Sequence, residues 1–106
     1  MPRGKYQTLT EQMFYILLCL RRECCGVDIM EQVAQITDGQ VTIGPGTLYS
    51  LLENFLAEGF IQETRVEGRK RSYRITGAGQ VKLEEEYGRL LRQAQDYRRF
   101  VMEDMG

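Results

Sequence analysis

The sequence predicts a mainly α-helical fold that carries one small β-hairpin and ends in a long helix. Three observations support this fold class. Apolar residues recur at helical spacing in three successive segments before residue 59. Two short β-like runs follow around a charged turn. A heptad-like apolar pattern then continues almost to the end of the 106-residue chain.

The first predicted helix runs from Leu9 to Leu20. Thr8 and Glu11 have the Thr-x-x-Glu spacing of a capping box, so we expect Thr8 at the N-cap. The helix is apolar almost all round, and such a helix must be covered on every face. Two interpretations stay open: a central helix of the subunit's own core, or a helix with one side against a second subunit.

The second and third predicted helices lie between glycine breaks. Gly26 interrupts the first apolar segment, and a helix over about residues 27–36 follows. The third helix is predicted from Pro45 to Glu58, because proline suits the first helical turn and Gly59 suits the position just past the end. Its inward stripe is expected to be Leu48, Leu51, Leu52 and Phe55.

The hydrophobic period changes after the third helix. Residues 60–66 and 72–75 have the pattern of two short strands, joined by the charged, glycine-containing turn at 67–71. Thr76 is expected to cap the final helix. Together these elements predict a winged helix-turn-helix domain at residues 1–76 and a C-terminal dimerisation helix at residues 77–106.

The charge distribution is uneven, although the formal net charge is only -1. Residues 65–74 carry five basic side chains and one acidic side chain. Residues 28–63 carry six acidic side chains and no basic one. A concentrated basic hairpin favours binding to phosphates, whereas the bland interpretation is a solubilising turn.

The third helix is the predicted reader of DNA. With its leucines facing inward, it presents small polar residues, and the major groove of DNA admits a helix of this kind. A polar helix face is also often just a solvated face. The predicted DNA-binding residues, on the third helix and the hairpin, are Pro45, Thr47, Tyr49, Ser50, Asn54, Arg69, Lys70, Arg71 and Arg74.

The last helix is predicted to pair two subunits. Its apolar residues recur at steps of four and three, which is the pattern of a helix packed on another helix. Packing on the chain's own body is the alternative, but a helix of this length would overhang so small a domain. The predicted dimerisation residues are Leu83, Tyr87, Leu90, Leu91, Ala94, Tyr97 and Val101.

A pocket for a small aromatic effector between the subunits is a further candidate, because aromatic walls suit flat ligands. Aromatic residues at helical spacing are more often simple core. The candidate pocket residues are Phe14, Tyr15, Tyr87, Tyr97 and Phe100.

Enzymatic, metal-binding and membrane-spanning functions are not expected. The chain has no histidine, and its three cysteines lack the spacing of a zinc site, so we expect no catalytic residue, no metal and no cofactor. The carboxylates at residues 84–86 are interpreted as a solvated helix face. Cys24 and Cys25 are expected to be buried, unreactive thiols in the reduced cytoplasm, and no apolar run is long enough for a membrane.

Four separated segments resemble the PadR-like family of transcriptional regulators, named for repressors of phenolic acid decarboxylase. The first two, from the first and second helices, are LTEQMFYILLCL and CGVDIMEQV. The third helix and the hairpin contribute IGPGTLYSLLENFLAEGFI and EGRKRSYRITGAG. The resemblance covers most of residues 9–80. The chain is similar to the smaller subgroup of the family, whose members have a single C-terminal helix.

The resemblance implies a homodimer that represses nearby genes and releases DNA when it binds a small, often aromatic effector. It also implies DNA contacts from Pro45, Thr47, Tyr49 and residues 69–71. Family members often have lysine or arginine where Ser50, Glu53 and Asn54 stand here, and an aromatic residue in place of Val27. We therefore expect affinity to depend on the hairpin and on an N-terminal arm containing Arg3 and Lys5. The alternative function is a winged helix that docks a protein through the acidic surface of residues 28–63.

Overall fold

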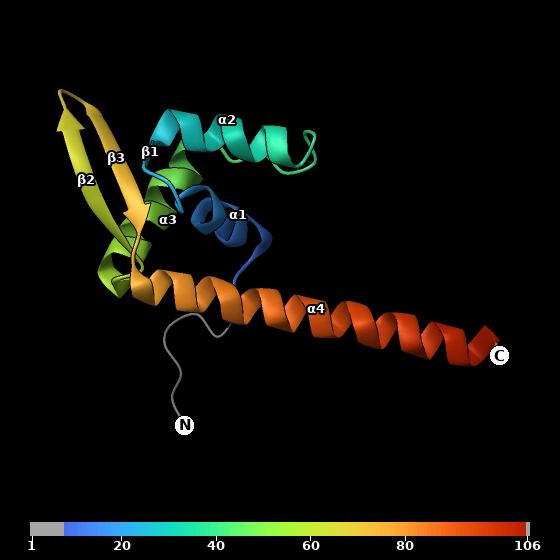
Figure 1. Ribbon diagram of the computed structural model, residues 1–106. Coiled ribbons are helices and arrows are strands. Elements are labelled where there is room, and N and C mark those ends of the chain that lie inside the picture. The colour runs from blue at the N-terminus through green and yellow to red at the C-terminus, as the bar shows by residue number, and fades with distance from the viewer. Residues whose placement is uncertain (1–7, 106) are drawn as a thin grey trace.

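The computed structural model describes residues 8–105, and the predicted contacts of Arg3 and Lys5 lie outside this range. Three short helices and a small antiparallel sheet form the body, and a long C-terminal helix projects from it (Figure 1). The fold is mainly helical with a winged helix-turn-helix body, which confirms the predicted fold class. None of the described helices is long and apolar enough to cross a membrane.

Helix α1 spans Glu11–Cys19, and the predicted cap at Thr8 is wrong. Thr10 is the N-cap, and its hydroxyl accepts a hydrogen bond from the Met13 amide at 3.2 Å. The residue before Thr10 is bound outside α1, because the Leu9 amide donates a hydrogen bond to the Glu86 carboxylate of the C-terminal helix. The helix therefore starts two residues later than the capping-box spacing suggests.

Helices α2 (Gly26–Ile36) and α3 (Pro45–Glu58) follow the predicted pattern closely. Pro45 begins α3, and Gly59 ends it with a φ of 77°, a left-handed conformation that glycine adopts without strain. The predicted bounds of α3 are therefore confirmed. They were predictable because Pro45 and Gly59 each restrict the backbone at their own position.

Strands β2 (Ile61–Glu67) and β3 (Lys70–Ile75) form the predicted antiparallel hairpin, which we call the wing. The sequence did not predict a third strand, β1 (Cys24–Cys25), which pairs with β3 along its other edge. Two residues are too short a run to show a strand period. This strand joins the base of the wing to the start of α2.

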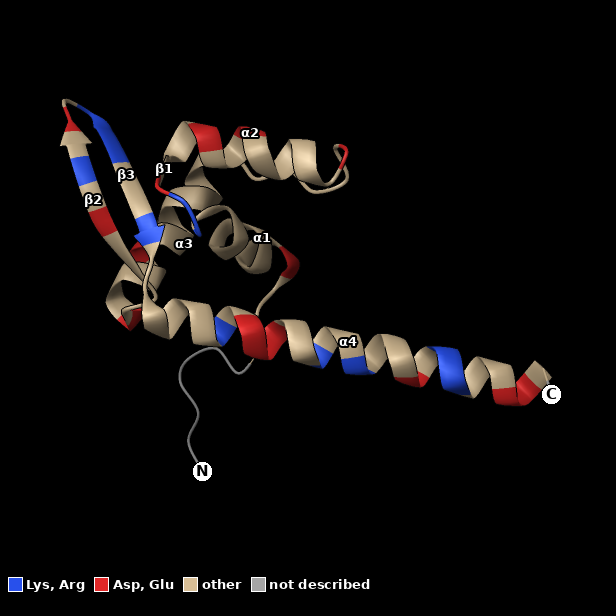
Figure 2. Cartoon of the chain, viewed as in Figure 1, with Lys and Arg blue, Asp and Glu red and all other residues tan. Residues whose placement is uncertain are grey.

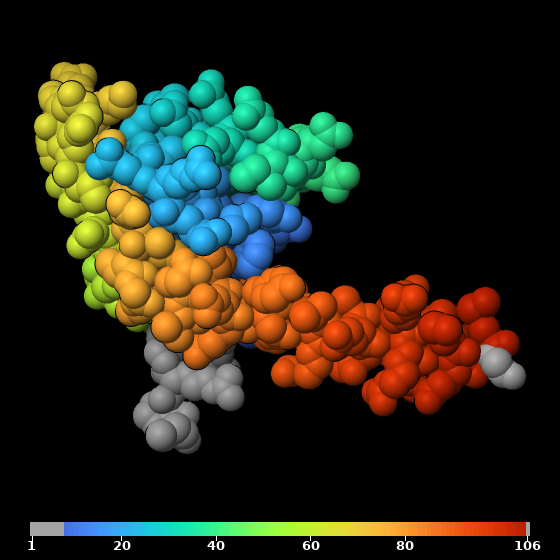
Figure 3. All heavy atoms as spheres, viewed as in Figure 1, coloured from blue at the N-terminus to red at the C-terminus, as the bar shows by residue number. Residues whose placement is uncertain are grey.

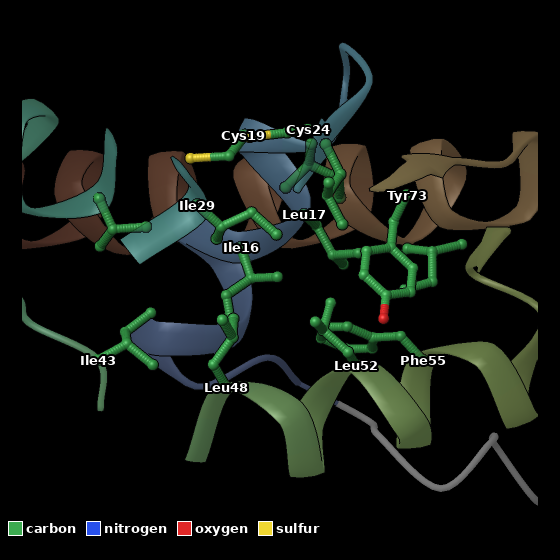
Figure 4. Close-up of a cluster of buried hydrophobic side chains, with 14 of the residues drawn as sticks. Ile16, Leu17, Cys19, Cys24, Ile29, Ile43, Leu48, Leu52, Phe55 and Tyr73 are labelled. Carbon is green, nitrogen blue, oxygen red and sulfur yellow. The ribbon is translucent and has the colours of Figure 1, made fainter. Parts of the chain in front are cut away.

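The core lies where the three short helices meet the base of the wing. The largest fully buried side chains include Ile16 and Leu17 of α1 and Leu48, Leu52 and Phe55 of α3. The wing also contributes to the core, because the ring of Tyr73 points toward Leu52 and Phe55 (Figure 4). Helix α1 is thus a central helix of the subunit's own core.

Helix α4 spans Gly77–Met105, and its buried residues among those described, Gly79, Leu83 and Glu86, lie near its start. Thr76 caps it as predicted, since its hydroxyl accepts from the Gly79 amide at 3.1 Å. Gly79 lies so close to the wing base that an added Cβ would be 2.1 Å from the Phe60 carbonyl oxygen. Leu83 reaches the core, and the later turns extend away from the body (Figures 1 and 3). We call residues 87–105 the arm.

Candidate nucleic-acid interface

Helix α3 has one exposed face opposite its buried leucines. Gly46, Ser50, Glu53 and Ala57 are exposed and recur at helical spacing, and we call these four residues the reader face. Asn54 lies toward the flank and is half-buried. The reader face is small and uncharged except for a single carboxylate.

Predicted DNA-binding residues flank the reader face on both sides. Pro45 begins α3, Thr47 lies in the first turn, and both are exposed. Tyr49 is also exposed and lies beside the wing. The N-terminal half of α3 is therefore open to a large partner.

The wing carries most of the positive charge near α3, whereas α2 and α3 show no basic residue (Figure 2). Two of its cations are already paired: Arg71 contacts Glu63 at 2.9 Å, and Arg65 contacts Glu67 at 3.7 Å. The carboxylate of Glu63 raises the pKa of Arg71 through this hydrogen bond. Within residues 8–105, Arg69, Lys70 and Arg74 form no ion pair.

The pairing of Arg71 was not foreseen, because Glu63 lies just before the basic window of residues 65–74. The two residues are on neighbouring strands, where diagonal pairs come within reach of long side chains. An irregularity in the register between Glu63 and Arg65 adds to this diagonal approach. A predicted hairpin register would have revealed the pair, whereas counting charge along the chain did not.

An open cleft of about 630 Å³ lies between the wing, the start of α2 and α3. It brings together Tyr49 of α3 and the wing cations Arg69, Lys70 and Arg71, all of which were predicted from the sequence. Pro45, Thr47, Ser50, Asn54 and Arg74 do not line it. The lining residues from the start of α2 were not predicted from the sequence; they are Gly26, Val27 and Asp28.

Gly26 explains how Tyr49 reaches this cleft. An added Cβ at Gly26 would be 2.6 Å from the Tyr49 hydroxyl oxygen, so only glycine leaves room for the ring at the start of α2. The N-cap residue Cys25 makes no side-chain hydrogen bond to the first turn of α2. The first turn of α2 also carries Asp28, whose carboxylate opposes the positive end of the α2 dipole on this side of the molecule.

The predicted dimerisation residues divide into three groups by their exposure. Leu83 is buried in the subunit's own core, which leaves the exposed stripe to begin at Tyr87. Val101 is half-buried. The remaining residues are exposed on α4, and we call them the seam: Tyr87, Leu90, Leu91, Ala94 and Tyr97.

A smaller cavity of about 210 Å³ lies between the start of α1 and α4. Phe14 and Tyr15 line it, and their rings pack edge to face with centroids 5.4 Å apart. Leu90 of the seam lines it too. The other candidate effector residues, Tyr87, Tyr97 and Phe100, do not.

The interpretation of residues 84–86 as a solvated face is wrong for Glu86. Its side chain is 4% exposed and pairs with Arg89. It also accepts a hydrogen bond from the Leu9 amide at 3.1 Å. The hydrogen bond from Arg89 holds the pKa of Glu86 below its usual range, although burial opposes this effect. Glu84 and Glu85 are exposed as expected.

The cysteines are buried, as predicted for Cys24 and Cys25, and none is in a disulfide. Burial, with help from nearby Asp28, raises the pKa of Cys24 to about 11. Gln32 approaches the Cys24 sulfur at 3.5 Å. A thiol with so high a pKa is protonated near neutral pH and is a poor nucleophile. No group of three or more candidate ligands among residues 8–105 is arranged to hold a metal ion.

A helix-turn-helix followed by a basic wing defines the winged-helix class of DNA-binding proteins. The transcriptional regulator PadR-like family model matches residues 16–85. The chain belongs to this family of transcriptional regulators.

Solved structures share the fold. A transcriptional regulator from Clostridium thermocellum has a TM-score of 0.71 at 22% identity, with 86% of this chain and 92% of that chain covered. A PadR family regulator from Eggerthella lenta has a TM-score of 0.73 at 20% identity, with 84% and 80% covered.

Bacillus subtilis PadR, solved in complex with operator DNA, has a TM-score of 0.62 at 25% identity. The match covers 71% of this chain and 45% of that chain. No curated protein matched this chain in sequence.

Proposed function

We propose that this regulator is a cytoplasmic repressor that binds a palindromic operator as a homodimer. In this account residues 1–76 bind DNA and residues 77–106 pair the subunits. The observation that carries the proposal is the cleft in which Tyr49 of α3 meets three cations of the wing. A surface that combines an exposed helix with adjacent cations suits duplex DNA, which offers a groove for the helix and phosphates for the cations.

The two parts of this surface have different tasks. Arg69, Lys70 and Arg74 have no carboxylate partner within residues 8–105, so they are available to phosphates. Contacts of this kind supply affinity and orientation without reading sequence. Thr47 and Ser50 are small exposed residues near the start of α3, so base edges in the major groove can approach them closely.

The arm supports the proposal of a homodimer. Tyr97 is 71% exposed and Phe100 is 65% exposed, and this end of α4 projects away from the body in Figures 1 and 3. Aromatic side chains at heptad-like spacing suit a second copy of the same helix. Two-fold symmetry would then place the half-sites about 34–36 Å apart or at a multiple of that distance.

The cavity at the foot of the arm is the proposed effector site. Phe14 and Tyr15 give it aromatic walls, and Leu90 connects it to the seam. A small aromatic effector bound there would touch α1 and the dimer seam at once. Binding that favours one arrangement of the two subunits would change the spacing of the wings and release the operator.

The test is a titration of the protein with its own upstream promoter DNA and with random duplex, at about 50 and 200 mM salt. A dimer that makes about 6–10 phosphate contacts should lose about a thousandfold or more in affinity over this range. If the protein also binds the promoter more tightly than random duplex, the result supports a sequence-specific regulator. Salt-independent or absent binding to both duplexes contradicts the proposal.

The second candidate function is protein docking, which the acidic surface of α2 and α3 favours. Residues 28–63 carry six acidic side chains and no basic one, and this is unusual for a reader of phosphates. Under this hypothesis the protein captures a basic partner and shows no salt-sensitive affinity for DNA. The same titration therefore separates the two functions.

A further inference from the structure

We propose that Glu53 selects the operator sequence by accepting a hydrogen bond from the amino group of a cytosine in each half-site. This inference rests on the proposed DNA binding through α3. It gives a specific task to the residue that departs most from the basic side chains expected on such a helix.

Glu53 lies on the exposed side of α3, away from its buried residues. It belongs to the exposed reader face, with Ser50 one turn before it and Ala57 one turn after it. Leu52 and Phe55, which are close to Glu53 in sequence, are buried on the core side of the helix. A duplex bound along the reader face would therefore meet the Glu53 carboxylate directly.

The carboxylate of Glu53 has no partner within residues 8–105, neither a hydrogen bond nor an ion pair. Two acids near the wing and the start of α1 are paired: Glu63 contacts Arg71, and Glu86 contacts Arg89 and the Leu9 amide. Glu53 thus keeps its full accepting capacity for an external donor. No contact of its carboxylate with the described residues explains its place on this face.

The chemistry of base edges restricts what such a carboxylate can bind. A carboxylate only accepts hydrogen bonds. In the major groove the donors are the amino groups of cytosine and adenine. Adenine places the acceptor N7 beside its amino group, which repels a carboxylate, whereas cytosine itself presents only the donor there. Glu53 therefore favours cytosine.

The opposite contact is missing from α3. Arginine or lysine to guanine is the commonest specific contact in the major groove, but residues 28–63 contain neither side chain. The unpaired carboxylate also repels phosphates and bases that offer only acceptors. It therefore acts against wrong sequences as well as for the right one.

The experiment uses the full chain and a pool of duplexes with a randomised central region. Selection gives the preferred half-site, and each base pair is then varied singly in binding titrations. We expect one position at which replacing C·G by T·A weakens binding by about 5- to 150-fold, the range of about 1–3 kcal/mol for one good base contact. Thymine supplies an acceptor where cytosine has its donor.

Two substitutions at Glu53 sharpen the test. Glu53→Ala should abolish the cytosine preference at that position and strengthen binding to random duplex. Glu53→Gln should shift the preference toward adenine, because an amide can pair with both N6 and N7. Glu58→Ala is the matched control: it removes the same charge from the last residue of α3, away from the reader face, and should keep the preference for cytosine.

The outcomes separate this inference from the proposed function. If Glu53→Ala and Glu58→Ala change the affinity equally and both keep the wild-type base preferences, the role of Glu53 is overturned. The proposal that the protein binds DNA then still stands. The same holds for a wild-type half-site without a preference for cytosine. A wild-type protein that binds no duplex overturns both proposals.

Discussion

The wing and the reader face expose different kinds of side chain from those of the arm. The wing presents the cations Arg69, Lys70 and Arg74, and the reader face beside it is small and almost free of apolar groups. The arm instead exposes large apolar side chains such as Tyr97 and Phe100. The difference fits the two proposed partners, a polyanion for the wing and reader face and a second apolar surface for the arm.

The joint between these regions is small and rests on a few specific contacts. Gly79 lets α4 approach the backbone of Phe60, and Glu86 joins Arg89 and the chain before α1. Substitutions in the arm, the joint and the wing should therefore have separable effects.

The largest effect is expected from Leu90→Asp in the seam. A buried charge at this position should convert the dimer to monomers, which sedimentation velocity would detect. A monomer binds one half-site at a time, so affinity for a palindromic operator should fall by about 100- to 10,000-fold. The control is Val81→Asp, at another exposed apolar residue of α4 that is off the seam. Leu90→Asp that stays dimeric would contradict the role of the seam.

Gly79→Ala tests the joint. Its Cβ would be 2.1 Å from the Phe60 carbonyl oxygen and 2.7 Å from a side-chain carbon of Ile75, so the start of α4 must shift. We expect a loss of about 1–3 kcal/mol in the free energy of unfolding, measured by urea denaturation. Gly77→Ala, where nothing lies within 4 Å of the added Cβ, should change stability little. Equal stability of the two variants would show that Gly79 does not lie as close to the Phe60 carbonyl as described.

Glu86→Gln gives the joint a pH signature. The pKa of Glu86 is lowered in the folded protein, so its contribution is present above its unfolded value of about 4.3 and is lost as pH falls through the folded value. We expect Glu86→Gln to lower the free energy of unfolding near neutral pH by about 1–3 kcal/mol. The variant should also lose less of this free energy than the wild type as the pH falls.

Denaturation curves between about pH 3 and pH 7 would measure this effect. Glu85→Gln, at an exposed neighbouring carboxylate, is the control and should follow the wild type. A pH dependence of stability that is the same in Glu86→Gln and wild type would rule out this role for the buried pair.

The smallest effect is expected from Glu63→Gln in the wing. This change releases Arg71 from its ion pair and makes one more cation available to a phosphate. Affinity should rise a few-fold for all duplexes, and the salt dependence should steepen by about 0.9 in the log–log slope for each additional phosphate that is neutralised. Glu103→Gln removes the same charge at the far end of the arm and should leave the slope unchanged. A lower affinity in Glu63→Gln would mean that the ion pair positions the wing.

Features that depend on nearby residues were predictable from the sequence. Pro45 and Gly59 act on the backbone where they stand, so the bounds of α3 were correct. Thr76 and the heptad-like pattern likewise indicated the start and the exposed stripe of α4. Four of the nine residues that line the cleft, Tyr49 and the consecutive cations at 69–71, were predicted from the sequence as DNA-binding residues.

Features that depend on distant residues were missed. The Leu9 amide and the Glu86 carboxylate are 77 positions apart, so neither the displaced cap at Thr10 nor the buried acid had a local signal. The approach of Gly26 to Tyr49 likewise requires α2 and α3 to be placed relative to one another. Such contacts are decided by packing, which residue spacing alone does not describe.

The most direct test of the proposed division between wing and arm is the salt dependence of DNA binding for two triple variants. One replaces Arg69, Lys70 and Arg74 with alanine, and the other replaces Arg92, Arg98 and Arg99 of the arm. If the wing cations hold the phosphates, the wing variant binds every duplex more weakly, and its log–log slope falls by about 0.9 for each phosphate that is no longer neutralised. The arm variant keeps the wild-type slope. A wild-type slope in the wing variant, or an equally reduced slope in the arm variant, would contradict the account.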